Sequence, residues 1–102
     1  MVKRVLHNSG QIDIILDQLN ALNDKTRQDI LLLFQARQEY CVNDIAKQFK
    51  VSRPTVSHHL NLMKRSKILN SRKDGKEIYY SFNKEYVIGT LELLVGYLKG
   101  CC

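Results

Sequence analysis

Residues 51–65, VSRPTVSHHLNLMKR, constrain the fold of this chain more than any other segment. Ser52 is suited to cap a helix, because its hydroxyl can accept a hydrogen bond from an unpaired amide of the first turn. Pro54 is tolerated in that turn, where its missing N–H has no partner in any case. We therefore expect a helix that starts near Arg53.

The two sides of this helix differ in chemistry. Val56, Leu60 and Met63 recur at helical spacing, which predicts that one side faces a core. The other side carries polar and basic groups that can bond phosphates or base edges of a nucleic acid. The residues expected on that side are Arg53, Thr55, Ser57, His58, Asn61 and Lys64. This pattern is typical of a DNA recognition helix.

The flanking segments extend the pattern. Apolar spacing predicts a short helix over residues 42–49, and two helices joined by so short a connection form a helix-turn-helix. Downstream, the strand-like residues 68–72 and 77–82 are separated by residues 73–76, in which Asp-Gly signals a hairpin. A hairpin after a recognition helix is a wing. The basic residues of this wing are Arg72, Lys73 and Lys76.

The net charge of +6 is concentrated in one part of the chain. Residues 1–46 and residues 77–102 each sum to −1, whereas residues 47–76 hold nine Lys and Arg against Asp74 alone. A cationic helix-turn-helix and wing favour contact with the phosphates of double-stranded DNA. An anionic membrane surface is a weaker interpretation of the same charge, and we expect no membrane contact.

The chain of 102 residues is expected to form one domain over residues 11–99. Residues 1–10 are predicted to be a flexible arm, and residues 100–102 a tail that bears two cysteines. A domain of this size buries about 60–65% of its unfolded surface, so a second subunit would add stability. No long apolar run is present, so we expect neither a transmembrane helix nor a signal peptide. We therefore expect a cytoplasmic protein.

Three further helices are predicted from apolar spacing, over residues 11–22, from a cap at Asn23 or Asp24 to about Arg37, and over residues 84–98. The first and the last have broad apolar faces and are expected to pair with each other. The predicted fold is therefore mainly α with a β-hairpin wing, a winged helix-turn-helix that forms a homodimer through its first and last helices. Two-fold symmetry would place the recognition helices about 34 Å apart and predicts a palindromic operator.

Three segments resemble the ArsR/SmtB family, namely ALNDKTR at residues 21–27, SRPTVSHHL at residues 52–60 and GKEIYYS at residues 75–81. The resemblance covers about residues 12–99. It implies a dimeric repressor that occupies its own operator. It further implies release when a metal ion, a metalloid or a reactive sulfur or oxygen species reaches a sensor site, with no other cofactor required.

The sensor sites of the family are incomplete in this chain. Its two-thiol motif, Cys-Val-Cys-Asp-Leu, corresponds to residues 41–45, CVNDI, so Asn43 replaces the second thiol. The persulfide-sensing branch has a cysteine where Leu32 stands, and only its C-terminal thiol has a counterpart here. The zinc site of the last helix uses Asp and His pairs and is absent. The aligned positions hold Lys84, Tyr86, Tyr97 and Gly100.

The remaining sensor candidates are Cys41, Cys101 and Cys102. Cys41 stands at a predicted helix start, where the amide dipoles favour a thiolate. The three thiols together could ligate a soft ion or metalloid such as arsenite. Alternatively, a persulfide, a disulfide or another oxidation could act on them. In the simplest interpretation Cys41 is a small buried residue and the tail has no sensing role.

Other classes of function are less well supported. The sequence holds no Cys-x-x-Cys, phosphate loop, paired carboxylates or Ser-His-Asp set from which an active site could be assembled, so we expect no enzyme. A winged helix that binds proteins, or a regulator that responds to no ligand, remains an alternative. Such a protein would be indifferent to the loss of Arg53 and Lys64.

Overall fold

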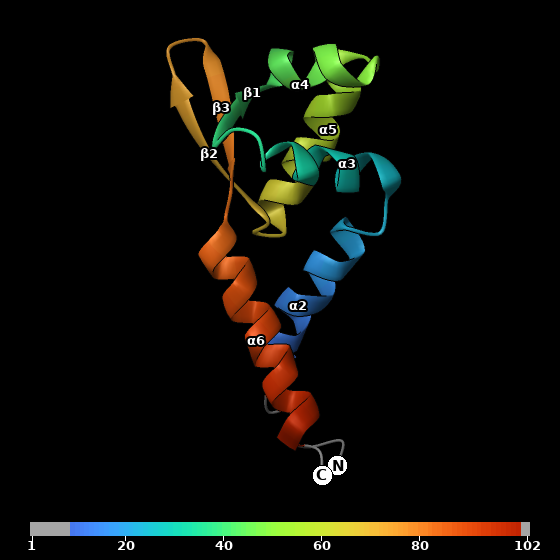
Figure 1. Ribbon diagram of the computed structural model, residues 1–102, viewed down its shortest axis with the longest axis vertical. Helices are drawn as coiled ribbons and strands as arrows, with labels where there is room; N and C mark the ends of the chain where they lie inside the picture. The colour runs from blue at the N-terminus through green and yellow to red at the C-terminus, as the bar shows by residue number, and fades with distance from the viewer. Residues whose placement is uncertain (1–8, 101–102) are drawn as a thin grey trace.

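The computed structural model describes residues 9–100 (Figure 1). The elements in chain order are α2 (Ser9–Ala21), α3 (Lys25–Leu33), β1 (Glu39–Cys41), α4 (Val42–Phe49), α5 (Arg53–Arg65), β2 (Leu69–Asp74), β3 (Glu77–Phe82) and α6 (Lys84–Gly100). This is a winged helix-turn-helix, as the sequence predicted. None of the described helices is long and apolar enough to cross a membrane.

The elements divide the molecule into a body and a stem. Figure 1 shows α3, α4, α5 and the sheet together at one end, with α2 and α6 extending side by side from the other. Hydrogen bonds join the two stem helices at both ends of their contact, between Thr90 and Gln18 at 2.6 Å and from the Tyr97 hydroxyl to Gln11 Oε1 at 2.8 Å. The predicted pairing of these two helices is confirmed.

The sheet has three antiparallel strands in the order β1-β3-β2. Tyr40 pairs with Tyr80 across β1 and β3, and Leu69 pairs with Phe82 across β2 and β3. The hairpin between β2 and β3 is closed by two residues, of which Gly75 has φ 63°. A hairpin loop of the II′ type needs positive φ at this first loop position, where glycine has no steric cost.

The core lies where the helix-turn-helix packs on the sheet. Side chains from α3, α4, α5 and the residue just before β2 are fully enclosed there, and burying each apolar side chain stabilises the fold by about 1.5–3 kcal/mol. The enclosed side chains are Ile30, Ile45, Val56, Leu60, Met63 and Ile68. The apolar side of the predicted recognition helix is therefore confirmed.

The structure corrects several predicted boundaries. The prediction missed β1, so the sheet contains one strand in addition to the two strands of the wing. α3 ends at Leu33 and not near Arg37. The backbone N–H groups of Phe34, Gln35 and Ala36 bond the carbonyls three residues back at 3.2, 3.2 and 3.0 Å, and the Leu33 carbonyl also accepts the Tyr40 hydroxyl at 3.0 Å. α2 begins at Ser9, inside the segment predicted as a flexible arm, and residues 1–8 lie outside the described part of the chain.

Candidate functional site

The start of α5 is fixed by a side-chain cap. Ser52 Oγ accepts the backbone N–H of Thr55 at 3.3 Å and lies 2.8 Å from Thr55 Oγ1. Pro54 occupies the first turn, where no N–H is needed. The helix therefore begins at Arg53, as the sequence predicted.

Opposite its buried side, α5 presents its polar residues to solvent. Ser57 is half-buried, and the other residues predicted as DNA contacts on this helix are exposed, namely Arg53, Thr55, His58, Asn61 and Lys64. His58, Asn61 and Lys64 line a shallow depression together with Arg65 and Lys67. The arrangement offers cationic and amide donors on a convex helix, which fits the width of a DNA major groove.

His59, the neighbour of His58, faces inward instead. Its Nδ1 lies 3.2 Å from an Arg27 guanidinium nitrogen of α3. Burial lowers the pKa of His59, and the carboxylate of Asp24 opposes that effect. Arg27 also donates through Nε to the Ala21 carbonyl at the end of α2. Arg27 and His59 therefore hold α2, α3 and α5 together.

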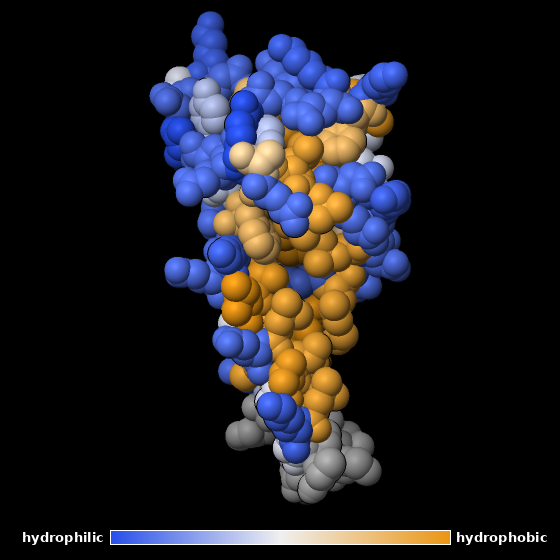
Figure 2. Space-filling view, in the orientation of Figure 1, coloured by the Kyte–Doolittle hydropathy of each residue, from blue (hydrophilic) through white to orange (hydrophobic). Residues whose placement is uncertain are grey.

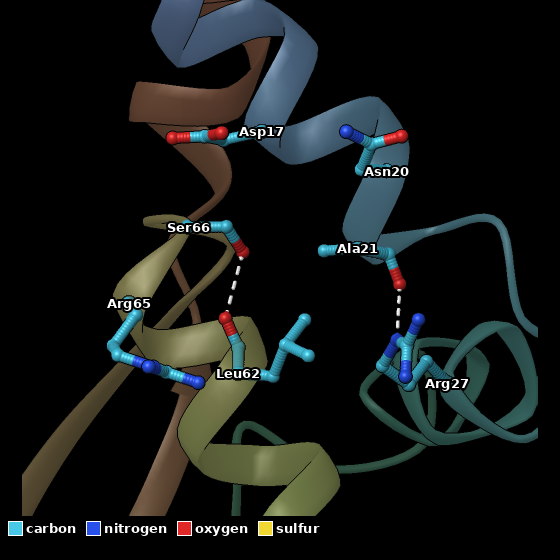
Figure 3. A pocket seen from close by; sticks show the side chains of 7 residues that line it. All are labelled: Asp17, Asn20, Ala21, Arg27, Leu62, Arg65 and Ser66. Carbon is cyan, nitrogen blue, oxygen red and sulfur yellow. Dashed lines mark hydrogen bonds between the residues drawn. The ribbon is translucent and has the colours of Figure 1, made fainter.

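A pocket lies beside the end of α5, between this helix, α2 and α3 (Figure 3). Figure 3 shows the Ser66 hydroxyl donating to the Leu62 carbonyl, at 3.0 Å, where the helix ends. Asp17 and Asn20 project from α2 on the opposite rim, and Arg27 enters from α3. The pocket marks the seam between the stem and the body of the molecule.

Within the wing, the three basic residues predicted as DNA contacts differ. Lys73 and Lys76 are exposed near the hairpin tip, and no ion pair holds either of them within the described residues. Arg72 donates two hydrogen bonds to Glu39 of β1, through Nε at 2.7 Å and through a terminal nitrogen at 2.8 Å. Its guanidinium also lies 4.7 Å from the Tyr79 ring centre. Arg72 is thus engaged within the protein.

The Arg72–Glu39 pair shifts the ionisation of both groups. The hydrogen bonds from Arg72 lower the pKa of the Glu39 carboxyl, and those to Glu39 raise the pKa of the Arg72 guanidinium. The pair fastens the wing to β1, a link that sequence analysis missed because the two residues are far apart in the chain.

All nine Lys and Arg of residues 47–76 are exposed. Arg72 alone among them forms an ion pair with another described residue. In Figure 2 hydrophilic residues gather at the top and along the sides of the body, around a hydrophobic area that continues into the stem. The body therefore carries eight cations that are available to an anionic partner.

Cys41 ends β1 and is the N-cap of α4, which agrees with its predicted place at a helix start. Its side chain is buried, with 9% of the residue exposed. The Asp44 carboxylate accepts the Cys41 backbone N–H at 3.5 Å and pairs with Arg37 at 3.0 Å. A hydrogen bond from the Cys41 thiol, followed by the Arg37 contacts, lowers the pKa of Asp44.

The other two predicted sensor residues, Cys101 and Cys102, lie outside the described residues. Gly100, the last described residue, is about 25 Å from the start of α6 by the rise of a helix of this length. Cys41 pairs with Tyr79 of β3, three residues before Phe82, where that strand ends and leads into α6. Within residues 9–100, no three His, Cys, Asp or Glu side chains form a cluster that could hold a metal ion.

Comparison with known proteins identifies the fold and the family. Residues 24–71 match the family model described as "Bacterial regulatory protein, arsR family". The chain is 32% identical over 79 residues to the transcriptional repressor SdpR of Bacillus subtilis, which covers 78% of this chain and 87% of that protein. The chain belongs to the arsR family.

Two further likenesses place this arsR-family chain among its relatives. It is 43% identical over 67 residues to a Staphylococcus aureus homologue of the cadmium resistance regulator CadC, covering 66% of this chain but 55% of that protein. A homodimeric winged helix-turn-helix domain, Mb0332 from Mycobacterium bovis, superimposes with a TM-score of 0.72 at 24% identity, covering 92% of this chain and 86% of that domain.

Membership in the family decides the class of function. Its members are DNA-binding transcriptional repressors and not enzymes, which confirms both predictions made from the sequence. The prediction of an ArsR/SmtB relative is likewise confirmed. The roles of individual side chains in reading DNA or sensing a ligand remain predictions.

Proposed function

We propose that this arsR-family repressor binds a palindromic operator by inserting α5 into the major groove. One observation carries the proposal, namely that the outer side of α5 is exposed and cationic while its other side is sealed into the core. Arg53 and Lys64 supply phosphate or base contacts at the two ends of the helix. His58 and Asn61 lie between them, within reach of base edges.

The wing completes the proposed contact with DNA. Lys73 and Lys76, beside the hairpin tip, contact phosphates of the same duplex. Arg72 keeps the hairpin in place through Glu39 and so acts on DNA through the position of the wing. This role for Arg72 differs from the direct contact predicted from the sequence.

We further propose that two copies associate through the stem. The stem exposes apolar side chains on both of its helices, with 45–65% of each apolar residue accessible on α6 at Leu91, Val95 and Leu98. Leu16 and Leu19 of α2 add to this surface, which Figure 2 shows as a continuous hydrophobic area. Contiguous apolar area of this kind marks an interface. The homodimeric Mycobacterium bovis domain of the same fold supports the proposal.

For release from DNA we propose ligation of a soft metal ion or metalloid by cysteine thiolates. The likeness to a cadmium resistance regulator and the preference of thiolates for soft ions support this inducer class. Two residues beyond Gly100 reach about 7 Å, which is too short to return along α6 to Cys41 of the same protomer. A site that joins Cys41 to the tail cysteines therefore forms between the two subunits.

A thiol-redox or persulfide response of Cys41 and the tail is the second candidate. It uses the same residues, and the family resemblance covers both kinds of inducer. A single experiment separates them. Reduced protein is bound to labelled DNA from upstream of its own coding sequence, and fluorescence anisotropy is followed during titration with arsenite, cadmium, zinc, an organic persulfide or diamide.

Each outcome of this titration decides one point. Release by arsenite or cadmium alone establishes thiolate ligation. Release by persulfide or diamide alone establishes a redox switch. Retention of DNA with every reagent overturns the sensing role of all three cysteines, while the DNA-binding proposal stands on the initial complex.

A further inference from the structure

Two lysines of the helix-turn-helix have a left-handed backbone conformation. Lys50 has φ 54° and Lys67 has φ 68°, and no other non-glycine residue of the described chain has positive φ. In this region the Cβ atom crowds the following carbonyl, so glycine or asparagine normally occupies it. Both lysines therefore cost the fold free energy that a glycine would not.

These two strained positions lie on either side of α5, one before the helix begins and one after it ends. Lys50 is the C-cap of α4, and two residues separate it from the start of α5. Lys67 follows the C-cap of α5, Ser66. There the Ile68 N–H bonds the Met63 carbonyl at 2.9 Å and the Lys67 N–H bonds the Lys64 carbonyl at 3.0 Å. This pair of bonds is the Schellman motif, whose left-handed residue is usually glycine.

Packing does not explain why lysine occupies either position. Both side chains are exposed, and neither takes part in an ion pair or a side-chain hydrogen bond with another described residue. Lys67 does line the depression that also contains His58, Asn61 and Lys64 of the outer side of α5. Lys67 therefore lies beside the residues of α5 that are proposed to face DNA.

We propose that Lys50 and Lys67 are phosphate clamps at the two ends of α5, retained for DNA affinity at the expense of stability. Each ammonium group contacts a phosphate oxygen of the operator, Lys50 before the recognition helix and Lys67 after it. Strained backbone conformations concentrate at functional positions when the strained residue has a function that its replacement lacks. The inference rests on the proposed binding of DNA by α5.

The proposal predicts that stability and affinity change in opposite directions. Lys67→Gly and Lys50→Gly, made separately, should raise the urea midpoint of unfolding because the strain is removed. The same variants should bind operator DNA more weakly. The negative slope of log Kobs against log salt should become shallower by about 0.9 for each lost phosphate contact. Lys67→Asn should behave like Lys67→Gly, because asparagine also tolerates this conformation.

Matched variants separate the effect of the lysine charge from the effect of the backbone conformation. Lys67→Arg keeps the cation and should retain the wild-type salt slope. Lys84→Asn removes an exposed cation at the start of α6, outside the cationic segment, and should leave the slope unchanged. A more stable Lys67→Gly that binds DNA with the wild-type affinity and slope would overturn the clamp role.

Three further outcomes test the strain, the proposed function and the clamp role separately. A loss of stability in both glycine variants would overturn the strain argument, whatever their affinity. If the wild-type protein bound no DNA, the proposed function itself would fail, although the rise in stability would still be measurable. If the wild type bound DNA in a manner dependent on Arg53 and Lys64 but indifferent to Lys50 and Lys67, this inference alone would fail.

Discussion

Arg72 of the wing and Glu39 of β1 form a two-pronged ion pair, with N–O distances of 2.7 and 2.8 Å. The pair joins the outermost strand of the hairpin to the strand that ends at Cys41. Since both groups are solvent-exposed, its effect on stability is small. We expect the pair to fix the angle at which Lys73 and Lys76 leave the body.

The pair has a defined pH dependence. Because Arg72 lowers the pKa of Glu39 in the folded protein, the contribution of the pair is complete above the unfolded pKa and is lost as the pH falls through the folded pKa. In Arg72→Gln the pKa of Glu39, measured by NMR titration, should return toward its ordinary value. A pKa that is the same in both proteins would show that the ion pair does not form in solution.

The same pair distinguishes two kinds of wing residue. Lys73→Gln should make the negative slope of log Kobs against log salt shallower by about 0.9, as expected when a phosphate contact is lost. Arg72→Gln should lower affinity through a loosened wing, with a smaller change of slope. Equal slope changes in both variants would mean that Arg72 reaches DNA directly.

A second prediction concerns the start of α5. Ser52→Ala removes the acceptor for the Thr55 N–H and should lower the free energy of unfolding by about 1 kcal/mol. Ser57→Ala lies in the same helix, where its hydroxyl is no cap, and should change that free energy by less than about 0.5 kcal/mol. Chemical denaturation of both proteins measures the difference. Equal effects would argue against the cap.

A third prediction tests the stem as the dimer interface. Leu91→Glu places a charge in the exposed apolar surface of α6 and should convert the dimer to a monomer in light scattering after size exclusion. Glu92→Gln, at the adjacent exposed position, should leave the oligomeric state unchanged. Circular dichroism checks that both variants are folded. A folded Leu91→Glu protein that remained dimeric would exclude this part of the stem from the interface.

A fourth prediction concerns Cys41. Cys41→Ser should fold normally, because serine is a preferred N-cap and Cys41 holds that position before α4. DNA affinity should be retained while release by the inducer is lost, in the anisotropy titration described above. A paired variant, Cys101→Ser with Cys102→Ser, tests the tail in the same assay. Full inducibility of Cys41→Ser would remove this thiol from the mechanism.

Much of the fold follows from local sequence signals. α4 and α5 were predicted within a residue or so because apolar spacing and caps agree there. β1 was missed because a strand of three residues, Glu39–Cys41, is too short to show alternation. The end of α3 was misplaced because no glycine or proline marks it, and the Tyr40 hydroxyl that adds a second hydrogen bond to the Leu33 carbonyl comes from a later element.

The candidate site was less predictable. The outer side of α5 follows from helical spacing, since a residue on a helix faces the direction that its position dictates. The partner of Arg72 could not be found this way, because contacts between distant strands leave no mark in local spacing. Nor does local sequence show that Lys50 and Lys67 have positive φ, since lysine is not a residue that signals a left-handed position.

The most direct test of the central claim is fluorescence anisotropy of upstream DNA with wild-type, Arg53→Ala, Lys64→Ala and Lys84→Ala proteins over a series of salt concentrations. We predict that Arg53→Ala and Lys64→Ala bind more weakly and with a shallower salt dependence, the slope falling by about 0.9 for each lost phosphate contact. Lys84→Ala should match the wild type. Wild-type affinity and slope in both α5 variants would contradict the assignment of α5 as the DNA-reading helix.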